Sequence, residues 1–225
     1  MENKKKAMGM MGIVLLFCLV MAVVDGILQA NYFVKSGIKL VLFLGAPVLY
    51  AGVQKELRIS SFLTLDKKST RLALWLCIPV YAVILGGYLL LQDVFDFSGI
   101  TKSLTQNIGV NRNNFLFVSL YISFVNSLLE EFFFRGFAFL TLKTVTTRRI
   151  AYLFSALIFS VYHVAMMIGW FSVGVFVIVL AGLFAGGLIF NYLDEKTGTI
   201  YPSWFVHMFA NFAINTIGFI LFGVI

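Results

Sequence analysis

The chain has 225 residues, of which 60% are hydrophobic and only 12% are charged. This composition leaves too little polar surface to coat a water-soluble globule, so it excludes that class and favours a polytopic membrane protein. The net charge of +7 would suit either nucleic acid or anionic lipid headgroups. The two cysteines, Cys18 and Cys77, both lie in apolar stretches and are expected to be small hydrophobic residues, not a disulfide pair.

Apolar stretches long enough to cross a bilayer as helices recur along the whole chain. The first follows a basic leader, residues 1–6, as the apolar part of a signal peptide would. We interpret it as a transmembrane helix because the apolar run is long enough to span and no A-x-A cleavage site follows it. The predicted spans are Ala7–Ala30, Val34–Val53, Leu72–Gln92, Phe115–Leu142, Ile150–Ile168, Phe171–Tyr192 and Ser203–Ile225.

The polar connector between the third and fourth spans contains apolar residues at helical spacing. Phe97, Ile100, Leu104 and Ile108 recur three or four residues apart. They predict a short helix that lies in the membrane interface or packs on the bundle as an ordinary loop helix.

Some polar and small residues within the spans have expected structural roles. Lys35 and Lys39 fall in the first turns of the second span, where long side chains can reach the interface. Asp25, near the end of the first span, is expected to be solvated. Gly182 and Gly186 form a small-xxx-small pair that allows close helix approach.

The basic residues are distributed unequally between the two sides of the predicted bundle. With the N-terminus inside, twelve lie on the inner side and four on the outer side, which predicts a cytoplasmic N-terminus. The same distribution indicates anionic lipid, and not nucleic acid, as the partner of the positive charge. The inner residues are Lys4, Lys5, Lys6, Lys55, Arg58, Lys67, Lys68, Arg71, Lys143, Arg148, Arg149 and Lys196, and the outer ones are Lys35, Lys39, Lys102 and Arg112.

The fourth span carries three ionisable residues in an otherwise apolar segment. An ionisable side chain at the centre of a transmembrane helix costs about 2.5–3.5 kcal/mol even on insertion scales, so a functional role is the favoured interpretation. Glu131 and Arg135 are four residues apart and can pair on one helix face. We infer that Arg135 holds Glu131, which leaves Glu130 without a cation and able to act as a general base.

The fifth and seventh spans carry both histidines of the chain. His163 lies four residues after Phe159, and His207 and Asn211 share a helix face. Hydrolysis of a peptide bond needs a base for water, donors for the oxyanion and a proton for the leaving amine. Glu130 with His163 can supply the base and the proton, and His207 with Asn211 can supply the donors.

The same residues are compatible with other chemistries. Glu130, His163 and His207 could instead hold a divalent metal such as zinc, although the HExxH pattern is absent. Ser127 and Ser160 lie nearby in the sequence, but neither lies in a nucleophile elbow. A Glu–Arg pair, a histidine or an asparagine within a span is individually as well explained by helix packing.

Taken together, the three polar groups resemble the motifs of the CAAX-protease and bacteriocin-processing family (CPBP, or Abi), over about residues 115–225. The resemblance implies a membrane endopeptidase in which Glu130 and His163 activate water and His207 and Asn211 stabilise the oxyanion. It also implies that Glu131 and Arg135 orient the site. Family members are often described as metalloproteases, and the metal stays an open alternative here. The matching motifs are Glu130-Glu131-x-x-x-Arg135, Phe159-x-x-x-His163 and His207-x-x-x-Asn211.

We therefore expect an all-α, polytopic membrane bundle of about seven helices that forms one domain, residues 1–225. Residues 1–114 would form the N-terminal spans and the connector, and residues 115–225 the catalytic core. The expected substrate is a membrane-associated peptide or protein, in peptide maturation, bacteriocin self-immunity or signalling at a bacterial plasma membrane. The alternative is a non-catalytic scaffold or immunity protein that binds another envelope protein. A transporter would be expected to carry buried carboxylates on more spans.

Overall fold

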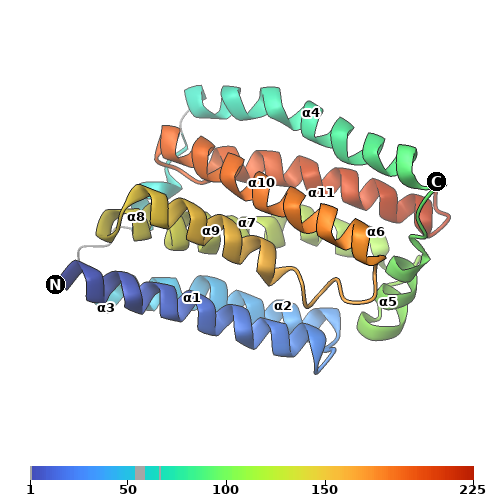
Figure 1. Ribbon diagram of the computed structural model, residues 1–225, viewed down its shortest axis with the longest axis horizontal. Helices are drawn as coiled ribbons and strands as arrows, with labels where there is room; N and C mark the ends of the chain where they lie inside the picture. Colours follow the sequence, from blue (N-terminus) through green and yellow to red (C-terminus); the bar gives the residue numbers. More distant parts are fainter. Residues whose placement is uncertain (1, 54–58, 66) are drawn as a thin grey trace.

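The structure, a computed structural model, describes residues 2–53, 59–65 and 67–225, and it is helical throughout this part of the chain (Figure 1). The predicted all-α membrane bundle is confirmed. Residues 54–58 and 66, between the second and third predicted spans, lie outside the described residues, and with them two of the basic residues assigned to the inner side, Lys55 and Arg58. The elements are α1 (Glu2–Gly26), α2 (Tyr32–Leu40), η1 (Val41–Gly45), α3 (Ala46–Val53), η2 (Ile59–Leu63), α4 (Lys67–Leu91), α5 (Ser98–Ile108), α6 (Phe115–Tyr121), η3 (Ile122–Asn126), α7 (Ser127–Glu130), η4 (Glu131–Thr141), α8 (Leu142–Val145), α9 (Arg148–Tyr162), α10 (Val173–Thr197) and α11 (Tyr201–Leu221).

Six helices in the described ranges are long and apolar enough to cross a membrane. The fifth predicted span corresponds to α9, which has 15 residues and is therefore only about 22 Å long. Counted with α9, the chain runs along the bundle an odd number of times, in agreement with termini that lie at opposite ends of the molecule (Figure 1). The six candidate spans are Glu2–Gly26, Tyr32–Gly52, Ala73–Leu91, Phe115–Val145, Val173–Thr197 and Tyr201–Leu221.

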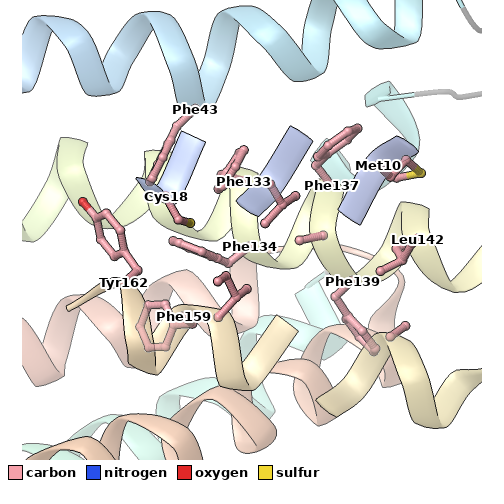
Figure 2. Packing of buried hydrophobic residues seen from close by; sticks show 14 of the residues in the cluster. Met10, Cys18, Phe43, Phe133, Phe134, Phe137, Phe139, Leu142, Phe159 and Tyr162 are labelled. Carbon is pink, nitrogen blue, oxygen red and sulfur yellow. The ribbon is translucent and has the colours of Figure 1, made fainter. Parts of the chain in front are cut away.

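One aromatic core joins the N-terminal helices to the helices that carry the polar motifs (Figure 2). Phe43 of η1 stacks on Phe133 of η4 with ring centroids 4.1 Å apart and planes 6° from parallel. Phe134 packs edge-on against Phe43 and against Phe159 of α9. Phe133 and Phe134 are fully buried, so this phenylalanine run fills the core and does not face lipid.

The second and fourth spans contain π-helical segments, in which the helix is locally wider than an α-helix. In the described residues these are η1, η3 and η4. Single π-turns often lie at functional sites because they change the direction of nearby side chains. Here η3 ends at Asn126, η4 begins at Glu131, and η1 follows directly on the helix that carries Lys39.

The helix predicted in the polar connector is present as α5. The Ser98 N–H donates to Asp96 Oδ1 at 2.8 Å, and this hydrogen bond lowers the pKa of the Asp96 carboxyl. Trp170 Nε1 donates to Ser103 Oγ at 3.1 Å, so α5 is fastened to the turn that follows His163.

The close approach of α10 to its neighbour occurs at a glycine that the sequence pattern did not select. A Cβ on Gly182 or Gly186 would have no atom within 4 Å, whereas a Cβ on Gly187 would lie 3.0 Å from the Cα of Ala156 in α9. The prediction that Gly182 and Gly186 allow the close helix approach was therefore wrong. Spacing alone could not tell which face of α10 meets α9.

Gly187→Leu should lower the stability of the protein, because the new side chain would collide with the backbone of α9. The expected loss is about 1–3 kcal/mol, as for other overpacked cores. The unfolding temperature of the detergent-solubilised protein measures it. Gly186→Leu is the matched control and should leave that temperature close to the wild-type value. Equal effects of the two substitutions would contradict the assigned contact.

Candidate active site

The carboxylate of Glu130 meets both histidines of the chain in the interior of the bundle. Glu130 is the last residue of α7, His163 directly follows α9, and His207 lies two turns into α11. Glu130 Oε2 is 3.8 Å from Nε2 of His163 and 3.8 Å from Nε2 of His207. The side chain of Glu130 is only 3% exposed, so the three groups form a secluded polar cluster.

The other ring nitrogen of each histidine has its own partner. His163 Nδ1 lies 2.7 Å from the Phe159 carbonyl oxygen, and His207 Nδ1 lies 2.7 Å from Glu131 Oε1. A carbonyl or an ionised carboxylate can only accept, so Nδ1 of each ring carries the hydrogen. In a neutral ring the Nε2 lone pair is then left free, and both lone pairs face Glu130 Oε2.

Glu131 and Arg135 form the predicted ion pair, with Arg135 Nε 3.3 Å from Glu131 Oε2. The geometry is not that of a hydrogen bond, and the guanidinium nitrogens have no hydrogen-bond partner among the described residues. The guanidinium instead lies 4.0 Å from the ring centroid of Phe159 and 4.9 Å from that of Phe190. Cation–π contact and charge therefore hold Arg135, and Glu131 in turn holds His207.

A lysine from the second span also reaches the site. Lys39 Nζ lies 3.0 Å from Glu130 Oε1 and 2.6 Å from Asn126 Oδ1. Asn126 Nδ2 donates to the same Glu130 oxygen at 3.0 Å. The inference that Glu130 lacks a cation was therefore wrong, because the charge count considered only the fourth span.

The other two charges assigned to the membrane interface are also paired inside the protein. Lys35 Nζ lies 3.1 Å from Asp25 Oδ1, with side chains 10% and 4% exposed. Lys35 and Lys39 were expected to extend to the interface and Asp25 to be solvated, and all three expectations were wrong. The sequence signal that could have found them is the i, i+4 pair of lysines opposite an acidic residue in the preceding span.

The polar residues of α11 link this helix to its neighbours. Asn211 Nδ2 donates to the Ile122 carbonyl at 3.2 Å, and Asn215 Nδ2 donates to Ser119 O and Ser123 Oγ. Asn215 is thus a packing residue, as one of the sequence interpretations held. Asn211 uses one of its two amide hydrogens in this way, which leaves the second for another acceptor.

Asp194 is a buried acidic residue that lies between the predicted sixth and seventh spans. It lies in the last turns of α10, which continues to Thr197, past the predicted end of the span at Tyr192. The carboxylate accepts from the Ser203 N–H at 3.1 Å and from Ser203 Oγ at 2.7 Å. Because Ser203 is in the first turn of α11, Asp194 satisfies a helix-start N–H and so anchors the helix that carries His207.

In this arrangement the predicted metal ligands lie further apart than the ligands of a bound zinc ion, and a metal at this site stays a prediction. Zinc ligands at about 2.0–2.1 Å in a tetrahedron lie about 3.3–3.4 Å from one another, closer than the 3.8 Å from Glu130 Oε2 to Nε2 of either histidine. In the described part of the chain, no three His, Cys, Asp or Glu side chains form a group that could hold a metal ion.

Comparison with known proteins bears on the segment that holds the motifs. Residues 112–213 match the family model described as Type II CAAX prenyl endopeptidase Rce1-like. No curated protein and no solved structure matches the chain. The matched segment contains every predicted site residue, from Glu130 to Asn211, and leaves out α1–α5. Over this segment the chain is similar to CAAX-type membrane endopeptidases, in agreement with the resemblance that its three motifs carry.

Proposed function

We propose that this integral, multi-pass membrane protein is an endopeptidase that uses water activated by Glu130 and His163. Its substrate would be a peptide bond of a membrane-associated peptide or protein. The observation that carries the proposal is the convergence of Glu130 Oε2 with the free Nε2 atoms of both histidines at 3.8 Å. The match of residues 112–213 to a family model of endopeptidases supports hydrolysis as the reaction.

The spacing of these atoms suits a shared water molecule. A separation of 3.8 Å is too long for a direct hydrogen bond, but one water can lie about 2.8 Å from both atoms and donate a hydrogen to each. In the reaction the water gives a proton to Glu130 or His163 while its oxygen bonds to the scissile carbonyl carbon. The carbon–nitrogen bond then breaks, and the proton passes to the leaving amine.

The tetrahedral oxyanion would be stabilised by donors from α11. Asn211 has one amide hydrogen not used by the Ile122 carbonyl. His207 donates from Nε2 only when that atom is protonated, because its Nδ1 hydrogen points to Glu131. Arg135 and Glu131 orient this ring and do not touch the substrate in the proposed scheme.

The proposed setting is a bacterial plasma membrane, with the N-terminus in the cytoplasm and anionic lipids at the basic face. Lys35 and Lys39 are buried in ion pairs, so of the four basic residues counted as outer, two remain, Lys102 and Arg112. The excess of basic residues on the inner side is then larger, which supports this orientation. Peptide maturation, bacteriocin self-immunity and signalling are the roles we propose for the cleavage.

Replacing His163 should abolish proteolysis without leaving an unpaired buried charge. We expect membranes from cells that express the wild type to contain peptide termini that are absent with His163→Gln, because an amide cannot take up the proton of water. Mass spectrometry of the termini, at equal protein abundance, makes the comparison. The control is Ser160→Ala on the same helix, whose hydroxyl donates to the Leu180 carbonyl at 2.8 Å, and this variant should keep the new termini.

Loss of the new termini with Ser160→Ala would favour a serine nucleophile over activated water. If wild type and His163→Gln gave the same termini while the cellular phenotype persisted in both, the chain would be a scaffold or immunity protein and the proposed protease function would be wrong.

Arg135→Met should destabilise the protein strongly, because the Glu131 carboxylate would be buried without a cation. Removing one partner of a buried pair costs about 3–5 kcal/mol, which would appear as reduced abundance and a lower unfolding temperature in detergent. The double variant Arg135→Met/Glu131→Gln should recover abundance but not proteolysis, because the carboxylate that accepts from His207 is gone. If Arg135→Met were as abundant as the wild type, the ion pair of Arg135 with Glu131 would not stabilise the protein as predicted.

A further inference from the structure

We infer that Lys39 is a positioning residue of the proposed protease, which holds one oxygen of Glu130 so that the other faces the histidines. The inference rests on the proposed function and adds a residue from α2, outside the segment that matches the family. Asn126 belongs to the same arrangement as the partner that orients the ammonium.

The two oxygens of Glu130 have separate partners. Oε1 receives the ammonium of Lys39 and the amide of Asn126, each at 3.0 Å. Oε2 faces Nε2 of both histidines. A carboxylate that is free to rotate would present either oxygen to the substrate side. Two donors on Oε1 remove that freedom and leave Oε2 as the oxygen that can accept the proton of water.

The hydrogen-bond triangle determines the orientation of each of its members. Asn126 Oδ1 accepts from Lys39 at 2.6 Å, so its amide nitrogen must face Glu130. Asn126 and Glu130 are four residues apart, across the end of the π-helix η3. Lys39 Nζ also lies 5.2 Å from the ring centroid of Tyr162, the residue before His163, so the ammonium contacts the elements that carry both members of the water-activating pair.

The position of Lys39 is itself determined by the aromatic core. Phe43, one turn further along the same span, stacks on Phe133 of η4 with centroids 4.1 Å apart, and Figure 2 shows Phe43 beside Phe133, Phe134 and Cys18. Phe133 lies three residues after Glu130. The stacked rings therefore hold α2 in register with α7, and the ammonium approaches the carboxylate from a fixed direction.

A purely structural salt bridge is the alternative, and the chain contains its own control for it. Lys35, one turn before Lys39 on α2, pairs with Asp25 of α1 at 3.1 Å and is equally buried. That pair fastens two helices just as the Lys39 pair does, but it contacts neither histidine in any recorded interaction. A structural role predicts similar effects for the two lysines, whereas positioning predicts that only Lys39 changes the reaction.

The test compares Lys39→Met, Lys39→Arg and Lys35→Met in the purified full-length protein. Cleavage is followed with a fluorogenic peptide that spans a site found in the comparison of termini, and rates are expressed per folded, monodisperse molecule. We expect Lys39→Met to lower the rate at saturating peptide at least tenfold with little change in the half-saturating concentration. Lys39→Arg should recover part of the rate, and Lys35→Met should stay within twofold of the wild type. A Lys39→Met rate within twofold of the wild type, or equal losses for both lysines, would overturn the inference while leaving proteolysis intact.

A second measurement does not depend on proteolysis. Unfolding temperatures are compared for Lys39→Met, Glu130→Gln and the double variant. We expect each single substitution to lower the temperature and the double variant to recover much of the loss, because a buried charge is left unpaired only in the singles. If the decrease in unfolding temperature of the double variant equalled the sum of the two single decreases, Lys39 would not hold Glu130. If the wild type produced no cleavage at all, the proposed function would fail, and the same cycle would still decide whether the pair exists.

Discussion

The need to neutralise the Glu130 carboxylate inside a membrane-embedded bundle is the constraint on which the other features of the site depend. An ionisable group at the centre of a transmembrane helix costs about 2.5–3.5 kcal/mol on insertion scales, and a buried charge stripped of its partner costs about 3–5 kcal/mol. The chain meets this constraint with Lys39, 3.0 Å away on a helix some ninety residues earlier in the sequence. Lys39 can neutralise Glu130 only if the second span packs against α7. The ionised state of Glu130 therefore depends on the position of the second span, and the ion pair in turn helps to hold that span in place. The ion pair between Lys35 and Asp25 links the second span to α1 in the same way.

Charge brings these helices together, but aromatic packing gives the site its geometry. Coulomb attraction falls slowly with distance, so it tolerates many arrangements of two side chains. A stacked ring pair tolerates few, and Phe43 on Phe133 fixes η1, which directly follows α2, against η4 within the densely packed core of Figure 2. Phe159 belongs to both the aromatic core and the polar cluster. Its carbonyl oxygen accepts a hydrogen bond from His163, and its ring contacts the guanidinium of Arg135. The polar cluster is therefore built from residues whose neighbours in the sequence form the apolar core.

The sequence predicted the class of fold and the residues that converge, and it failed where a partner comes from a distant span. Hydropathy located the helices because a bilayer demands long apolar runs. Motif spacing selected Glu130, His163 and His207, which the structure brings together. Lys39 was missed because a lysine near a span end is usually explained by its reach to the interface. Only the packing of the second span on η4, through Phe43 of η1, shows that Lys39 points inward. Gly187 was missed for a similar reason, since a small-residue pattern does not reveal which helix face meets a neighbour.

The inferred role of Lys39 also bears on what a family resemblance can transfer. The matched segment, residues 112–213, contains the proposed base, both histidines and the proposed oxyanion donors. A carboxylate in that segment has two chemically equivalent oxygens, and nothing within the three motifs distinguishes them. The distinction arises when Lys39 and Asn126 occupy Oε1, and one of these two residues lies outside the match. The proposed base therefore depends on more than the matched segment. That segment supplies the Glu130 carboxylate, and Lys39 of α2 helps to determine which of its two oxygens faces the histidines.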